Sequence, residues 1–174
     1  MNKVKGQFEL LGLQAKAVKL EELEFVTTFT NLGLPKEVIT RLQGLFNEVK
    51  EIAGQTINIG KIIIMKLIEF VKENPNMAIG LAIGLGLSIL SGMLISSIPI
   101  IGQGLNAIIT PIVALIVIPV GVLRGHRLDK ALNNKEYVGN SLFEDMITII
   151  KKFWALLVDI FSSVKDLLNE KTYI

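Results

Sequence analysis

One uncharged run limits what this chain can fold into: Met77–Leu123 contains no Asp, Glu, Lys or Arg. A helix that crosses a bilayer needs roughly 20 apolar residues, so the run is about two spans long. A turn signal, SIPIIGQGLN, lies near its middle and contains Pro99 and two glycines. The sequence therefore predicts an all-α membrane protein with a transmembrane helical hairpin, whose spans cover 77–98 and about 105–123.

Composition excludes several other classes of protein. The 174 residues are 51% hydrophobic and 20% charged, and the mean hydropathy of +0.54 is high for a soluble domain. The net charge of +2, without a basic run rich in aromatics, argues against nucleic acid as a partner. The chain has no Cys, which rules out disulfides and thiolate metal sites. Charge interrupts the N-terminal apolar positions, so we expect an internal segment to reach the membrane.

Amphipathic helices are predicted on both sides of the hairpin. A helix over 8–32 has Phe8, Leu11, Ala15 and Val18 on its apolar face, and a two-faced helix follows over 35–53. The next helix is apolar around most of its circumference, so it is either buried or interfacial, and we predict the latter. The predicted organisation is cytoplasmic N-terminal amphipathic helices over 1–56, an interfacial helix over 57–76, the hairpin over 77–123, and a basic turn with a long amphipathic helix over 124–174.

Small residues occupy every fourth position of the first span. They are Gly80, Gly84, Ser88, Gly92 and Ser96, a stripe of the glycine-zipper type. In lipid, helices associate by close backbone approach, which small side chains permit. The stripe is predicted to be a helix-packing groove, and two alternatives stay open. It seats either the second span of the same hairpin or a neighbouring copy in a homo-oligomer.

Charges flank the hairpin, whereas its apex has none. Positive-inside asymmetry predicts both termini in the cytoplasm, with a bacterial inner membrane as the expected host. At the apex, Pro99, Gln103 and Asn106 are the candidate pore-mouth or headgroup contacts. The predicted membrane-interface charges are Lys61, Lys66, Lys72, Arg124, Arg127 and Lys130.

The last predicted helix, over 141–169, has the clearest periodicity. Ser141 and Glu144 fit a capping box at its start. Apolar residues then recur at spacings of three and four, a seam that suits a helical bundle or a subunit contact. The seam residues are Phe143, Met146, Ile150, Phe153, Leu157, Ile160, Val164 and Leu167.

No constellation of residues predicts catalysis, a cofactor or a metal. His126 is the only histidine and stands among charges just past the second span. The glycines of GLAIGLG lie inside an uncharged span and follow no strand, which is the wrong context for phosphate binding. We therefore expect no enzyme activity, no catalytic residues, no cofactor and no metal.

An uncharged hairpin between amphipathic helices resembles the pore-forming domain of colicin-type toxins. The matching stretch is 77–123, with 57–74 before it and 141–169 after it. This chain has fewer helices ahead of the hairpin than that architecture uses. The segment VKENPNMAIGLAIGLGL also resembles small bacterial inner-membrane proteins with a Gly-rich anchor helix, although here a second span and a long helix follow.

Two functions follow from these predictions. The first is an oligomeric membrane protein that forms a pore or permeabilises the bilayer, as a toxin or immune effector does. The second is a membrane-anchored scaffold or adaptor whose amphipathic helices bind a protein partner or shape the bilayer. A third possibility is a soluble helical bundle with the hairpin as its buried core. In the first two cases the lipid bilayer is the principal partner.

Overall fold

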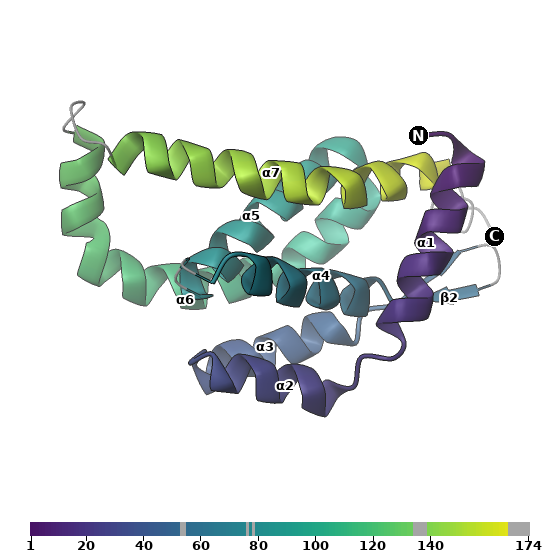
Figure 1. Cartoon of the computed structure of the whole chain (residues 1–174), viewed down its shortest axis with the longest axis horizontal. Helices are drawn as coiled ribbons and strands as arrows, with labels where there is room; N and C mark the ends of the chain where they lie inside the picture. The colour runs from purple at the N-terminus through teal and green to yellow at the C-terminus, as the bar shows by residue number, and fades with distance from the viewer. Residues whose placement is uncertain (53–54, 76, 78, 134–138, 167–174) are drawn as a thin grey trace.

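The protein is predominantly helical. The computed structural model describes residues 1–52, 55–75, 77, 79–133 and 139–166, and the side chains of these residues apart from 52, 117–133 and 139–143. Within these residues there are seven helices and one pair of short strands: α1 (Lys3–Ala17), α2 (Glu22–Asn31), α3 (Lys36–Phe46), β1 (Lys50–Ile52), β2 (Gln55–Ile57), α4 (Ile59–Glu73), α5 (Ile79–Ser97), α6 (Pro99–Asn133) and α7 (Gly139–Ser163). In Figure 1, α7 lies along one long side of the molecule, α2 and α3 lie along the other with α4 between them, and α1 crosses one end.

The helix predicted over 8–32 is in fact two helices, α1 and α2. The chain turns after Ala17, and the turn places Leu20 in the core beside the second helix. α2 ends at the predicted break, because Gly33 has a φ of +91° that glycine adopts without strain. The Leu34 N–H then donates to the Phe29 carbonyl across this turn.

α1 packs with the face opposite to the predicted one. Its buried residues are Gly6, Leu10, Leu13 and Ala17, whereas Phe8 and Leu11 are exposed. A Cβ on Gly6 would collide with the Ser163 hydroxyl, so only a glycine-bearing face can lie this close to α7.

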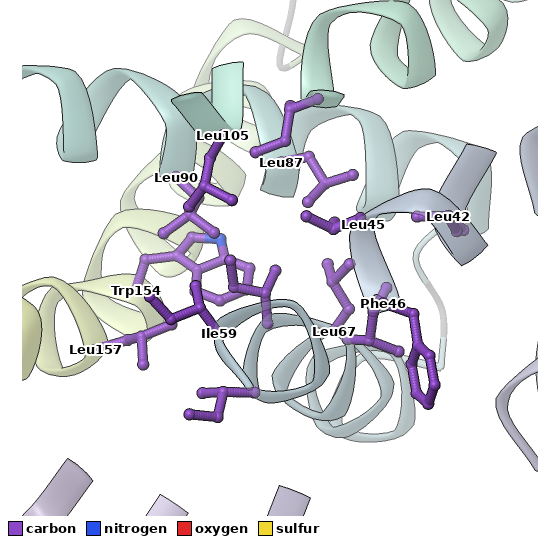
Figure 2. Close-up of a cluster of buried hydrophobic side chains, with 14 of the residues drawn as sticks. Leu42, Leu45, Phe46, Ile59, Leu67, Leu87, Leu90, Leu105, Trp154 and Leu157 are labelled. Carbon is purple, nitrogen blue, oxygen red and sulfur yellow. The ribbon is translucent and has the colours of Figure 1, made fainter. Parts of the chain in front are cut away.

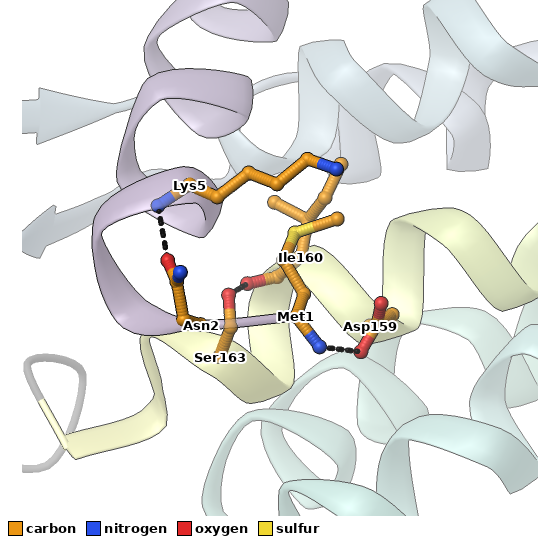
Figure 3. Close-up of polar contacts among 6 residues, drawn as sticks. All are labelled: Met1, Asn2, Lys5, Asp159, Ile160 and Ser163. Atoms are coloured by element: carbon orange, nitrogen blue, oxygen red, sulfur yellow. Dashed lines mark hydrogen bonds and ion pairs between the residues drawn. The ribbon is translucent and has the colours of Figure 1, made fainter.

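Figure 3 shows the polar contacts at this crossing. Asn2 caps α1 by accepting a hydrogen bond from the Lys5 N–H at 2.8 Å, and Ser163 donates to the Ile160 carbonyl at 2.7 Å. The N-terminal ammonium lies 3.7 Å from Asp159. The end of α7 is therefore held under α1 by close packing and one exposed ion pair.

α3 confirms the predicted two-faced helix but is shorter than the range 35–53. Val38, Ile39, Leu42, Leu45 and Phe46 are buried on one side. The chain then forms an antiparallel strand pair in which Lys50 is opposite Ile57. This β-hairpin is a departure from the all-α expectation.

α4 is the central helix of the bundle. It contacts α1, α3 and α5, and its buried side chains join the cluster drawn in Figure 2. Ile62, Ile63, Ile64 and Leu67 have no exposed surface. A helix this apolar is either buried in a bundle or placed at a membrane interface, and in this fold α4 is buried. The predicted interfacial position therefore does not describe α4 as it is packed here.

Two helices are long and apolar enough to cross a membrane: Ile79–Ser97 and Pro99–Ile116. They are α5 and the first half of α6, and they pack against α3, α4 and α7. Only 44% of the first span and 33% of the second are buried. The bundle therefore covers one side of the hairpin and leaves the other side open.

Candidate functional site: the α5–α6 hairpin

The turn between α5 and α6 is tighter than the sequence predicted. Pro99 begins α6, where a missing N–H costs nothing, so the turn reduces to Ile98. The Ile98 and Gly102 N–H groups continue the helical hydrogen bonding through it, at 2.7 and 2.8 Å. Of the predicted apex residues, Pro99 and Gln103 are exposed, whereas Asn106 lies inside the hairpin.

Gly102 is where the two helices approach most closely. A Cβ there would lie 2.6 Å from the backbone of Leu94 and closer still to the Ile95 nitrogen. Because the obstacle is backbone, a side chain at 102 could not be accommodated by a rotamer change. The sequence marked Gly102 as a turn residue, but its role is to permit this contact.

A polar cluster joins α5 to α6 within their apolar contact. The Ser91 hydroxyl, which is buried, donates to Asn106 Oδ1 at 2.7 Å, and the Thr110 hydroxyl donates to the same oxygen at 3.2 Å. Interhelical bonds of this kind are worth roughly 0.6 to 2 kcal/mol in membrane helix pairs. The Ser91 and Thr110 hydroxyls are thus paired within the hairpin itself.

An open groove of about 450 Å³ runs between the exposed sides of the two helices. Its walls carry no charge and combine small, hydroxyl and aliphatic side chains. The lining residues are Ser88, Ser91, Gly92, Ile95, Asn106, Ile109, Thr110, Val113 and Ala114.

The small-residue stripe faces α6 at one end and open space at the other. Gly80 lies against Ile116, with 3.6 Å from a Cβ at Gly80 to the Ile116 methyl, and Gly84 is buried. Ser88, Gly92 and Ser96 are exposed. A spacing of four residues advances about 40° beyond one helical turn, so the stripe winds around α5. Gly80 therefore faces the second span, whereas Ser88 and Gly92 line the groove.

The three lysines predicted at the membrane interface lie on α4 in three different environments. Lys61 stands 5.0 Å from the centre of the Phe46 ring, and Lys66 pairs with Glu69 at 2.9 Å. Lys72 is exposed beside the turn that leads into α5. The side chains of Arg124, Arg127 and Lys130 lie outside the described residues.

The α7 seam is an intramolecular bundle contact. Ile150, Leu157, Ile160 and Val164 are buried, while Met146 and Phe153 are half-buried. The Phe143 side chain and Leu167 lie outside the described residues. The seam packs against α5 and α1.

Trp154 belongs to the core, but one of its polar groups is unsatisfied. It is 1% exposed, and its indole N–H has no hydrogen-bond partner among the described residues. Gly86 on α5 faces the ring, and a Cβ there would lie 3.8 Å from Nε1, in ordinary van der Waals contact. No feature of the sequence signals this missing partner.

The described residues contain no group of three or more His, Cys, Asp or Glu that could hold a metal ion. Comparisons with family models, curated proteins and solved structures find no match for the chain. The fold itself defines a class: a predominantly helical protein with two helices that could be transmembrane. The resemblance to colicin-type domains stays a prediction from the helix pattern.

Proposed function

We propose that this protein acts on a lipid bilayer, and that α5 and α6 enter it as a hairpin and permeabilise it as an oligomer. The observation that carries the proposal is the open side of the hairpin: the bundle buries fewer than half of the residues in each of two adjacent uncharged spans. A core hairpin of a soluble protein would be mostly buried. In lipid, this exposed apolar surface is solvated by acyl chains.

The internal bonding of the hairpin supports its movement as a unit. The hydrogen bonds of Asn106 are to Ser91 and Thr110, both within the pair. Moving the hairpin out of the bundle therefore breaks neither of these hydrogen bonds, whose loss in hydrocarbon would be costly.

A charge on the hairpin tests insertion. Ala107 is exposed near the middle of the second span, so Ala107→Lys should leave the bundle folded in water. At the centre of a bilayer a lysine costs roughly 2.5 to 3.5 kcal/mol, enough to reduce insertion about a hundredfold. The measurements are dye release from vesicles and resistance to carbonate extraction. Ala155→Lys, an equally exposed site on α7, is the matched control and should behave as wild type. Equal activity of both variants would contradict hairpin insertion.

The groove tests oligomerisation. A Cβ at Gly92 meets nothing within 4 Å, so Gly92→Leu fits the monomer and fills the groove. We expect it to abolish chemically cross-linked oligomers in vesicles. Gly104→Leu, equally open but away from the groove, should leave them intact. If Gly92→Leu still oligomerises, the stripe serves only the hairpin.

A second candidate, a membrane-anchored scaffold, is favoured by the orientation of the polar groups. The Ser91 and Thr110 hydroxyls both donate to Asn106 Oδ1, so these hydroxyl protons are not directed at water in a pore. Carbonate-resistant protein that releases no dye at high protein-to-lipid ratio would select this function over the first.

A further inference from the structure

α1 has two apolar stripes on opposite faces. One stripe is buried against α4 and α7 and contains Leu10, Leu13 and Ala17. The other is exposed: Val4 is 62% exposed and Phe8 72%. The full exposed stripe is Val4, Phe8, Leu11, Ala15 and Val18, at alternating spacings of four and three.

The exposed stripe is not needed by the bundle. The buried stripe already provides all the apolar contact of α1 with the core, and the exposed side chains contact no other element extensively. Large side chains repeated along one exposed helix face indicate an interaction site rather than scattered surface residues.

Lysines border this stripe. At 100° per residue, Lys5, Lys16 and Lys19 fall along one edge and Lys3 along the other. All four are exposed, and none forms an ion pair within the described part of the chain. Glu9 is the single acidic residue on the helix. An apolar face edged by lysines is the pattern of helices that lie in the headgroup region of anionic membranes.

Charge favours lipid over a second copy as the occupant. If two α1 helices paired along this stripe, the e and g positions directly beside the seam would be Lys5, Gly12, Lys19, Gln7 and Gln14. These positions offer no carboxylate to neutralise the lysines, and antiparallel pairing would place like charges together. Anionic phosphates neutralise them without such a conflict.

We infer that the exposed face of α1, the stripe from Val4 to Val18 with its flanking lysines, docks on the surface of an anionic bilayer. The helix lies in the membrane plane with Phe8 among the upper acyl chains, while its other face stays on the bundle. This docking is independent of hairpin insertion, because α1 can bind a surface while α5 and α6 remain packed.

The test is co-sedimentation of the full chain with vesicles of phosphatidylcholine, with or without phosphatidylglycerol. The double variant Val4→Ala/Phe8→Ala should lower the partition coefficient on anionic vesicles by at least about tenfold. Replacing Lys5, Lys16 and Lys19 by Gln should lower it about fivefold per lysine, and high salt should do the same to wild type. Leu23→Ala on α2 is the control, since Leu23 is 74% exposed but lies outside the stripe.

Three results would overturn the proposal. The first is that wild-type protein does not bind anionic vesicles, and the second is that the stripe variants bind them as well as wild type does. The third is that sedimentation velocity without lipid shows a dimer, and that Val4→Ala/Phe8→Ala dissociates it. Circular dichroism must show unchanged helicity in each variant. Hairpin insertion is measured separately from docking. Ala107→Lys should remove only the carbonate-resistant fraction of the protein, and it should leave the salt-sensitive binding of α1 to vesicles unchanged.

Discussion

Glycines in this chain have very different neighbours, although the sequence presents them alike. Gly102 touches the backbone of α5, and Gly60 lies against the Leu45 carbonyl of α3. Gly92 and Gly104 face open space. Sequence periodicity detects where small residues recur but not which of them another backbone approaches.

Gly102→Ala and Gly104→Ala form a matched pair. At 102 the added methyl must push against backbone, so we expect a loss of about 1 to 3 kcal/mol in the free energy of unfolding. At 104 the same methyl meets nothing within 4 Å and should stabilise the helix by about 0.5 to 1 kcal/mol. Denaturant titration followed by circular dichroism measures both. Similar effects at the two sites would contradict the close approach at 102.

Trp154 combines large buried area with an unpaired N–H. Trp154→Ala should cost about 3 to 5 kcal/mol through the cavity it leaves. Trp154→Phe loses packing too, but it removes a donor whose burial without a partner costs about 1 to 3 kcal/mol. We therefore expect Trp154→Phe to change the free energy of unfolding by less than about 1 kcal/mol. A loss close to that of the alanine variant would mean that the N–H is satisfied.

At the scale of elements, long uncharged or strongly periodic segments were predictable and short irregular ones were not. α3, α5 and α7 lie where the sequence placed helices, whereas α6 is longer than its predicted span of about 105–123 and continues as a helix to Asn133, where a basic turn was predicted. The strand pair was missed because Val49 and Ile52 also fit the helical period of α3. In α1 the apolar face predicted from Phe8 is exposed, whereas the face that contains Gly6 packs against α7.

The hydrogen bond from Ser91 to Asn106 should couple the stabilities of α5 and α6. A double-mutant cycle with Ser91→Ala and Asn106→Ala should give a coupling free energy of about 1 kcal/mol. Ser96→Ala is the control for α5, since Ser96 bonds only to its own helix at Gly92, at 2.9 Å. The cycle Ser96→Ala with Asn106→Ala should show no coupling. Additive effects of Ser91 and Asn106 would show that the hairpin is held by packing alone.

At the scale of the molecule, the buried seam of α7 packs against α5. The sequence predicted that this seam forms a bundle or subunit contact, but it did not indicate which helix is the partner. The choice depends on tertiary packing: a Cβ at Gly86 would lie 3.8 Å from the Trp154 nitrogen on α7 and 3.7 Å from the Leu67 side chain on α4. Such a fit between three helices distant in sequence has no local signal. The hairpin can enter a bilayer only by leaving this contact.

Trp154 is the only tryptophan, so it reports that separation directly. In water we expect weak quenching by acrylamide, because the ring is 1% exposed. On vesicles that allow insertion, loss of α5 from the α7 seam should uncover the ring and raise quenching several-fold, or shift the emission if the ring moves into the headgroup region. Ala107→Lys should bind through α1 yet keep the protected signal. Protection that persists in wild-type protein resistant to carbonate would mean that α7 accompanies the hairpin into the membrane.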